Sequence, residues 1–446
     1  MHGATAAPQI LLGLNPMLAT TAILIATYAV IMSERMNRSI VALLGAGIMV
    51  MIGAMDQEEA IRCIDFNTIA LLIGMMILVA ITRKCGVFQY VAILSAQWVK
   101  ANPAGILAML SLVTAVFSAF LDNVTTVLLV APVTLVIARE LEIPPYPLLF
   151  AEIFASNIGG TATLIGDPPN ILIGSMVDLS FNDFVVNLTP VVVVVLAVQI
   201  LMIHMVWGRK MHSDPAHRAR VMAMRPADSI TDWRLLKQSV AVLVVVMVTF
   251  VLARPLHLEP GTIAMLGAAV LLFLDNFGHA PEAQSERTTH AYNEVEWITI
   301  FFFIGLFVVV HGVETAGVLK WLADRMLEAT GGDLAKTALT ILWASAILSA
   351  IVDNIPFVAT MIPLIKSMAP AFGGPEGLLP LWWSLSLGAC FGGNGTLIGA
   401  SANLTVAGIA ERNGIPFRFM TYLKYAFPMM LVSIAISHVY IWWRYL

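Results

Sequence analysis

Charged side chains are scarce in this sequence. Of its 446 residues only 12% are charged, with 24 Lys and Arg against 28 Asp and Glu. Soluble domains carry about 25% charged residues, so this chain has too few to cover a surface in water. The net charge of −4 also provides no basic field for nucleic acid. A soluble enzyme, a disordered protein and a nucleic-acid-binding protein are therefore excluded.

Cysteine is rare as well. Cys63, Cys85 and Cys390 lie far apart, so they form neither a zinc motif nor a disulfide framework. The sequence contains no GxxxxGK[ST] phosphate loop and no arrangement of a nucleophile with a base. We expect no metal, no cofactor and no enzymatic activity of the chain itself.

Long apolar runs dominate what is present, since 59% of the residues are hydrophobic. These runs do not alternate with polar residues, so they predict membrane helices, which need about 20 apolar residues to cross. The expected class is an all-α polytopic membrane protein with about ten transmembrane helices. The simple spans are predicted at 17–33, 39–55, 66–82, 184–207, 236–253, 260–275, 296–313 and 425–443.

Four apolar stretches are interrupted by polar residues. Residues 104–139 and 336–369 each contain two arms of about 16 residues around an Asp-Asn pair, which favours two re-entrant hairpins. Residues 147–178 and 380–410 have middles rich in Gly, Thr and Asn, as expected of helices broken within the membrane. Two amphipathic stretches, 86–101 and 317–331, are expected to lie at the interface.

The interrupted stretches form an internal repeat. Residues 157–170 and 390–403 are identical at seven of fourteen positions with an offset of 233, and the Asp-Asn tips recur at an offset of 231. Five spans in each half, an odd number, would insert the second copy upside down, as in secondary transporters. The predicted division is a first inverted repeat at 1–207, a basic linker at 208–235 and a second repeat at 236–446.

The distribution of basic residues predicts the orientation. The segment between the halves carries five Arg and two Lys within residues 209–237, so the positive-inside rule places it in the cytoplasm. Counting back puts Arg35 and Arg38 on the same side. We expect a multi-pass protein of the inner (plasma) membrane with both termini outside the cytoplasm.

Three carboxylates occur where an apolar chain should have none. Asp122 and Asp353 lie at the hairpin tips, and Asp167 follows Gly166 in the first broken helix. A charge at the bilayer centre costs roughly 3 kcal/mol or more, so each is a candidate for proton coupling. The structural alternative is an Asp that caps a helix N-terminus. Ala400 replaces Asp167 in the second copy, so the two half-sites are chemically unequal.

Uncharged polar residues around the tips and breaks are candidates for binding the substrate. Amides and hydroxyls supply donors and acceptors, and glycines let the backbone approach a small solute. The candidates are Asn123, Thr125, Thr126, Asn157, Gly159, Gly160, Thr161, Thr163, Asn170, Asn354, Gly392, Gly393, Asn394, Thr396 and Asn403. Glu152 could assist a proton path, and a packing role is equally supported.

These motifs resemble a known family. The runs LDNVTTVLLVAPVTLVI from Leu121, AEIFASNIGGTATLIGDPPNILI from Ala151 and VDNIPFVATMIPLIKSM from Val352 are similar to the ion transporter superfamily. The likeness is strongest to the branch of bacterial arsenite efflux permeases and the melanocyte P protein. It implies an inverted-repeat, elevator-like fold that holds a solute between hairpin tips and helix breaks.

The resemblance also implies an activity. It suggests export of arsenite or antimonite from the cytoplasm in exchange for protons, with a separate cytoplasmic ATPase as a possible partner. A sodium/proton antiporter and an anion transporter like the P protein are the alternatives. The Asp-Asn tips and Asp167 depart from the more distant dicarboxylate symporters, and their negative charge disfavours a dicarboxylate.

The proton-carrier assignment is testable by charge removal. Asp122→Asn and Asp353→Asn are each expected to abolish coupled transport, because an amide cannot exchange a proton, while the protein still inserts. Uptake into everted vesicles under a proton gradient measures the effect. Normal transport by both variants would show that the assignment is wrong.

Overall fold

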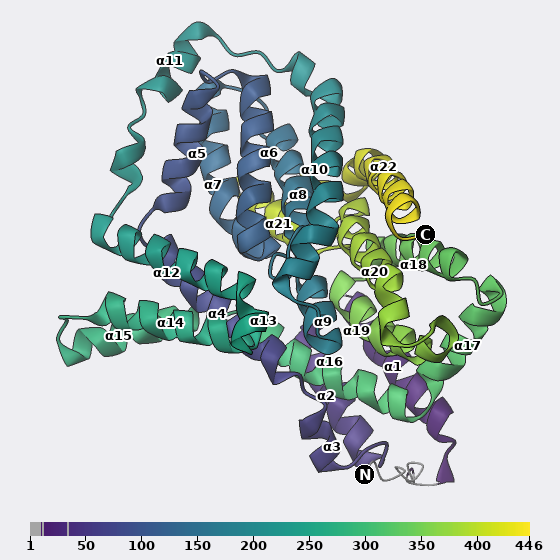
Figure 1. The fold of residues 1–446 in the computed structure, drawn as a ribbon. Coiled ribbons are helices and arrows are strands. Elements are labelled where there is room, and N and C mark those ends of the chain that lie inside the picture. Colours follow the sequence, from purple (N-terminus) through teal and green to yellow (C-terminus); the bar gives the residue numbers. More distant parts are fainter. Residues whose placement is uncertain (1–9, 11–12, 34) are drawn as a thin grey trace.

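The computed structural model describes residues 10, 13–33 and 35–446 (Figure 1). Within these residues the secondary structure is helical throughout, with no strand. Eight of the described helices have at least 18 residues and are apolar enough to cross a membrane. The predicted all-α polytopic class is confirmed.

The simple spans fall where the apolar runs predict them, within a few residues at each end. Three of them, α1, α2 and α14, have fewer than 18 residues. The helices are α1 (Pro16–Met32), α2 (Arg38–Met51), α4 (Phe66–Arg83), α10 (Phe181–Val206), α12 (Trp233–Val251), α14 (Pro260–Asn276), α16 (Trp297–Thr315) and α22 (Phe419–Tyr445).

Each hairpin consists of two helices that meet at an Asp-Asn tip. The first pair is α6 (Pro103–Phe120) and α7 (Asn123–Leu141), and the second is α18 (Leu334–Ile351) and α19 (Asn354–Ser367). Three of these arms have 18 or 19 residues, longer than the predicted 16, because Pro at the start of α6 and polar residues at the ends also fit a helix. Both tip aspartates cap the following helix.

The broken helices are also present as predicted. The first consists of α8 (Tyr146–Gly160) and α9 (Pro168–Val177), and the second of α20 (Leu379–Gly392), a single 3-10 turn η6 (Gly393–Gly395) and α21 (Ser401–Arg412). Pro168 and Pro169 occupy the first turn of α9, where proline costs no hydrogen bond. In the second copy α21 begins without a proline, so the break in the helix does not depend on proline.

Equivalent helices of the two halves pack in equivalent ways. The closest packing joins α4 to α14 and α2 to α16, and likewise α6 to α8 and α18 to α20. Glycine allows two of these contacts, since a Cβ on Gly74 would lie 2.5 Å from the backbone of Ala264, and one on Gly305 would lie 2.5 Å from that of Ala42. Gly74 and Gly305 are 231 residues apart, the offset of the hairpin tips.

Glycine also joins each hairpin to its broken helix. A Cβ on Gly159 would lie 2.2 Å from the carbonyl oxygen of Ala115, and one on Gly392 would lie 2.5 Å from that of Ala346. No side chain fits at such distances, so the backbones of α6 and α8, and of α18 and α20, are in direct contact. Each half therefore has a hairpin and a broken helix fastened together.

The segment between the halves is folded onto the first of them. It contains η2 (Gly208–Lys210), α11 (Pro215–Ala223) and η3 (Pro226–Ser229), and it lies along α5 (Val87–Trp98) and α7. Gln97 donates a hydrogen bond to the carbonyl of Met224 at 2.7 Å, and Arg220 donates one to that of Glu140 at 2.9 Å. The boundaries of the repeats and linker stay a prediction.

The remaining helices are shorter. The sequence predicted α5 and α17 (Val318–Thr330) but not the others, which are too short or too polar to form a long apolar run. These others are α3 (Gln57–Arg62), α13 (Ala253–Leu256), α15 (Pro281–Asn293), η4 (Ala369–Phe372) and η5 (Pro375–Leu378). The interfacial position of α5 and α17 stays a prediction.

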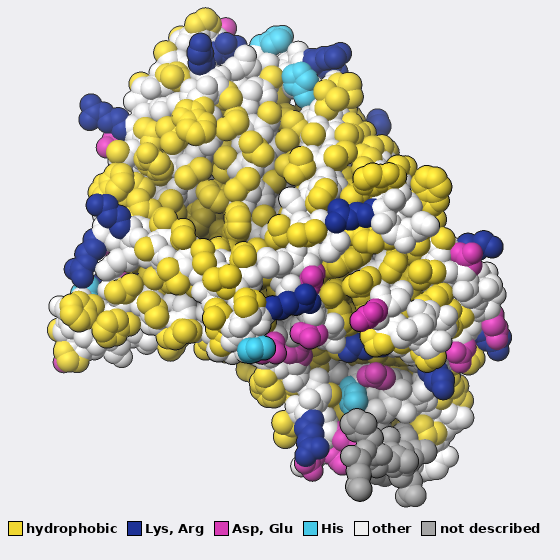
Figure 2. Space-filling model, viewed as in Figure 1, with side chains coloured by type: hydrophobic (Ala, Val, Ile, Leu, Met, Phe, Trp, Pro, Cys, Tyr) yellow, Lys and Arg dark blue, Asp and Glu magenta, His cyan; other side chains and the backbone are white. Residues whose placement is uncertain are grey.

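The outer surface is suited to lipid. Figure 2 shows a broad apolar surface over the region of α5, α6 and α10, with basic side chains gathered near the end marked by α11 in Figure 1. Exposed aliphatic side chains such as Val193, Val194 and Leu201 contribute to it. A soluble protein rarely exposes so large an apolar area, which agrees with a membrane location. The direction of insertion stays a prediction.

The glycine contact between hairpin and broken helix predicts a stability effect. Gly159→Ala is expected to lower the free energy of unfolding by about 1–3 kcal/mol, because the added methyl group overlaps a backbone that cannot move away. Unfolding in mixed detergent micelles measures it. Gly47→Ala is the matched control, since its Cβ would meet nothing within 4 Å. Equal stability of the two variants would contradict the predicted overlap.

Candidate functional site

A network of buried amides lies where the tips and breaks meet. The Asn157 side chain is at its centre and accepts a hydrogen bond from the Asn123 amide at 2.9 Å. Its own amide donates to the side-chain oxygens of Asn394 and Asn403, both at 2.9 Å. All four side chains are buried, and they come from α7, α8, η6 and α21. The network therefore joins the first half to the second.

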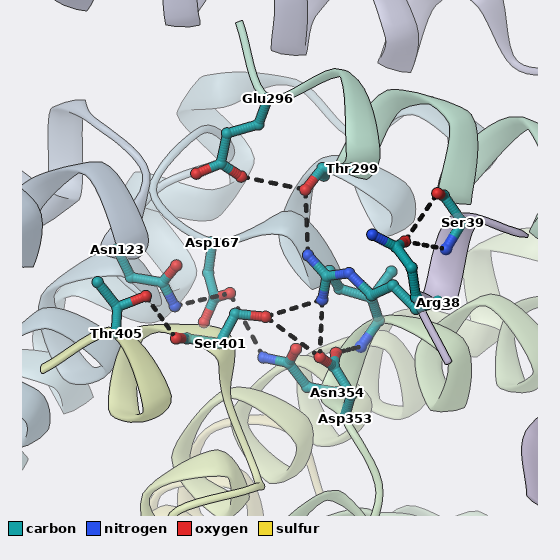
Figure 3. A network of polar contacts seen from close by, with 12 residues as sticks. Arg38, Ser39, Asn123, Asp167, Glu296, Thr299, Asp353, Asn354, Ser401 and Thr405 are labelled. Atoms are coloured by element: carbon teal, nitrogen blue, oxygen red, sulfur yellow. Dashed lines mark hydrogen bonds and ion pairs between the residues drawn. The ribbon is translucent and has the colours of Figure 1, made fainter. Parts of the chain in front are cut away.

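Asp167 lies beside this network and is fully buried. Its Oδ1 atom accepts hydrogen bonds from the amides of Asn123 at 3.3 Å and Asn354 at 3.4 Å, so both hairpin tips reach it (Figure 3). Among the described residues its Oδ2 atom has no hydrogen-bond partner. A buried carboxylate oxygen without a partner is costly, so Asp167 is equipped to accept a proton or a donor from a solute.

Arg38 is a site residue that sequence reasoning missed. Its guanidinium donates to Asp353 at 3.1 Å, to the Ser401 hydroxyl at 2.9 Å and to the Thr299 hydroxyl at 3.0 Å (Figure 3). It also lies over the ring of Phe302, 5.2 Å from the centroid. In the sequence Arg38 precedes an apolar span, and its charge indicated only which end of that span faces the cytoplasm. Its role depends on partners more than 250 residues away.

A small cavity of about 20 Å³ is enclosed here. The polar residues that line it are Arg38, Asp122, Asn123, Asp167, Glu296, Thr299, Asn354 and Ser401. Three carboxylates, those of Asp122, Asp167 and Glu296, therefore line the cavity together with one guanidinium. Asp353, which pairs with that guanidinium, adds a fourth carboxylate at the edge. Glu296 was also missed, because the apolar run after it predicted only the start of a span. A volume of this size holds about one water molecule, so in this structure the site is closed to a larger solute.

A larger cavity of about 310 Å³ adjoins the site at Arg38 and Asp353. Exposed residues such as Met36 and Leu404 also line it. The two cavities share Arg38 and Ser401. The Arg38–Asp353 ion pair therefore lies between the closed site and the wider space.

Several predicted binding residues hold the backbone rather than lining the cavity. The hydroxyls of Thr163 and Thr396 donate to the carbonyls of Ala119 and Ala350, each at 2.5 Å. Those carbonyls belong to the ends of α6 and α18, so each threonine fastens a helix break to its hairpin. Gly159 and Gly392 have the same role, because each lets its broken helix pack directly against the hairpin.

Two further asparagines stabilise the breaks themselves. The Asn170 amide donates to the carbonyls of Thr161 at 3.1 Å and Thr163 at 2.9 Å. The Asn403 amide donates to those of Gly393 at 2.7 Å and Thr396 at 2.8 Å. These bonds satisfy carbonyls that an unwound helix leaves free.

Thr126 is buried, and among the described residues its hydroxyl has no hydrogen-bond partner. The tip aspartates have local partners. The Asp122 carboxylate accepts hydrogen bonds from the Thr125 backbone at 2.8 Å and from the Thr125 hydroxyl. Asp353 caps α19 through the backbone of Ile355 at 3.0 Å. Both tip aspartates therefore cap a helix N-terminus, as the structural alternative predicted, and Asp353 also pairs with Arg38. Among the described residues Asp122 forms no ion pair.

Two broken helices that meet at buried polar groups are typical of a secondary membrane transporter. Comparison with known proteins gives the family. Residues 28–388 match the family described as citrate transporter (CitMHS), and the chain belongs to it. This match confirms the resemblance to the ion transporter superfamily. The assignment to the arsenite permease branch stays a prediction.

Similar proteins align with nearly the whole chain, and one of them is named as a transporter. An uncharacterized transporter of Mycobacterium tuberculosis is 43% identical over 427 residues, covering 95% of this chain and 97% of the relative. The 46 kDa membrane protein of Mycobacterium leprae is 41% identical over 429 residues, covering 95% and 98%. The human P protein is 34% identical over 515 residues, covering 95% of this chain and 60% of the P protein.

A solved structure shares the fold. The crystal structure of the Alcanivorax borkumensis YdaH transporter, described as having an unusual topology, matches with a TM-score of 0.59. The match covers 96% of this chain and 98% of YdaH at 12% sequence identity. At this identity the likeness concerns the fold alone.

The central amide predicts a further stability effect. Asn157→Ala is expected to lower the free energy of unfolding by about 2–4 kcal/mol, because it leaves the side-chain oxygens of Asn394 and Asn403 without a partner and removes one acceptor of the Asn123 amide. Unfolding in mixed micelles measures it. Asn182→Ala is the control, because Asn182 is exposed and bonds only to the carbonyl of Val251. A loss no larger than the control's would contradict the central role.

Proposed function

We propose that this transporter exports arsenite or antimonite from the cytoplasm in exchange for protons. The observation that carries the proposal is the buried carboxylate of Asp167 with its unpartnered Oδ2 atom beside a network of amides. Arsenite is a neutral trihydroxide at neutral pH. Its hydroxyls can donate to carboxylate and amide oxygens, and it brings no charge into the site.

The balance of charge supports a neutral solute. Asp122, Asp167, Asp353 and Glu296 surround one guanidinium, that of Arg38. An anion entering this site meets an excess of negative charge, whereas a neutral hydroxylated solute meets acceptors.

The same carboxylates suggest how protons are coupled. An ionised carboxylate accepts hydrogen bonds from a hydroxylated solute, whereas protonation removes its charge and turns one of its oxygens into a donor, which weakens that binding. Solute and proton would therefore compete for one site, which is the requirement for exchange. Asp122 and Asp167 are the better carriers, because Asp353 is held by Arg38 at 3.1 Å.

Citrate is the second candidate substrate. It is favoured by the description of the family and by Arg38, the one basic side chain that lines the small cavity among the described residues. Against it stands the excess of carboxylates, since a trianion would have to enter with protons or with a cation bound to it. A separate ATPase partner and the inner-membrane location remain parts of the proposal.

Everted membrane vesicles with an acidic interior distinguish the candidates. We expect accumulation of arsenite without added sodium, and no accumulation of citrate, because the site is acidic. Vesicles that carry the Asp167→Asn variant are the matched control and should lose the accumulation. Citrate uptake without arsenite uptake would refute the proposal, and sodium-dependent collapse of the proton gradient would favour an antiporter.

A further inference from the structure

A second buried carboxyl group lies outside the site, in the middle of α8. Glu152 has no exposed surface. One of its oxygens accepts a hydrogen bond from the hydroxyl of Thr134 on α7. Within the described part of the chain, its Oε2 atom has no hydrogen-bond partner. No basic side chain pairs with Glu152 in that part.

The second half of the molecule shows which residue types the fold accepts at the positions of Glu152 and Thr134. The hairpins are related by an offset of 231, which also aligns Pro132 inside α7 with Pro363 inside α19. This offset places Ile365 at the position of Thr134. The offset of 233 between the broken helices places Leu385 at the position of Glu152. Ile365 and Leu385 are both fully buried.

An apolar pair therefore fills the equivalent place in the same architecture. Replacing buried charged groups by well-packed apolar residues is often neutral or stabilising. Packing thus does not explain Glu152. Asp167 follows the same pattern, since its counterpart is the apolar Ala400, and each of the two acids has one oxygen without a partner.

The position of Glu152 relates it to one face of the molecule. It is five residues before Asn157, or about 7.5 Å along the helix axis at 1.5 Å per residue. Six residues, about 9 Å, separate it from the start of α8. That end lies next to the residue before the linker, since the rings of Tyr146 and Trp207 are 6.1 Å apart between centroids. Glu152 lies between the amide network and the linker face.

We propose that Glu152 is a second proton-binding group of the transporter. It takes one proton from water onto its carboxylate, carries it through the cycle and returns it to water, with no other bond changed. The Thr134 hydroxyl donates to the carboxylate in the ionised form. The inference rests on the proposed proton-coupled function and adds one proton per cycle to it.

Reconstituted vesicles under a gradient of one pH unit, with the membrane potential held at zero, test the proton count. Each transported proton adds a factor of about ten to the steady-state accumulation per pH unit. Glu152→Gln is therefore expected to accumulate about tenfold less arsenite than the wild type. Exchange of labelled for unlabelled arsenite at equal pH should stay within about twofold, because Glu152 does not line the site.

Two variants control this experiment. The double variant Thr134→Ile with Glu152→Leu copies the second half, and it should lose the same factor while remaining folded. Glu142→Gln, an exposed carboxyl at the end of α7, should behave as the wild type. Unchanged accumulation by Glu152→Gln would overturn the inference. So would loss of its arsenite exchange, because Glu152 would then act on the solute or on folding.

An infrared measurement separates this inference from the proposed substrate. The spectrum of the wild-type protein should show a protonated carboxyl band that Glu152→Gln lacks and Glu142→Gln retains. This result needs no substrate. If the wild type moves no arsenite, the proposed function fails, and the infrared band still decides whether Glu152 binds a proton. Retention of the band in Glu152→Gln would overturn the inference.

Discussion

The fold depends on how backbone groups are satisfied where two helices are broken. A broken helix frees carbonyl oxygens that lipid cannot satisfy. Asn170 and Asn403 take up those carbonyls, while Thr163 and Thr396 reach the neighbouring hairpins. The residues that the two copies share are thus largely those that make a break possible.

Charged groups are distributed unequally between the two copies. Asp353 is paired with Arg38, whereas Asp122 at the other tip has only its helix cap. The sites also differ at Asp167 and Ala400. A symmetric scaffold therefore encloses an asymmetric distribution of charge, and this asymmetry concentrates unpaired carboxyl groups in the first half.

The sequence was sufficient for the long apolar helices, the hairpin tips and the breaks, but not for the short polar helices. Apolar runs, Asp-Asn tips and glycine-rich middles are local features with a direct physical meaning, so their positions could be predicted within a few residues. The site was accessible only in part. Arg38 and Glu296 meet the tips through packing of α2 and α16, and no local pattern marks such a meeting. In a sequence, a hydroxyl group that bonds to the backbone likewise cannot be distinguished from one that lines a cavity.

The glycine contacts have a consequence for motion within the bilayer. Where Gly159 touches Ala115 and Gly392 touches Ala346, no gap can open between hairpin and broken helix without exposing bare backbone to hydrocarbon. Each such pair is therefore one packed unit in this structure. In any change of access a hairpin and its broken helix would have to move together, and the lipid beside them would have to rearrange with them.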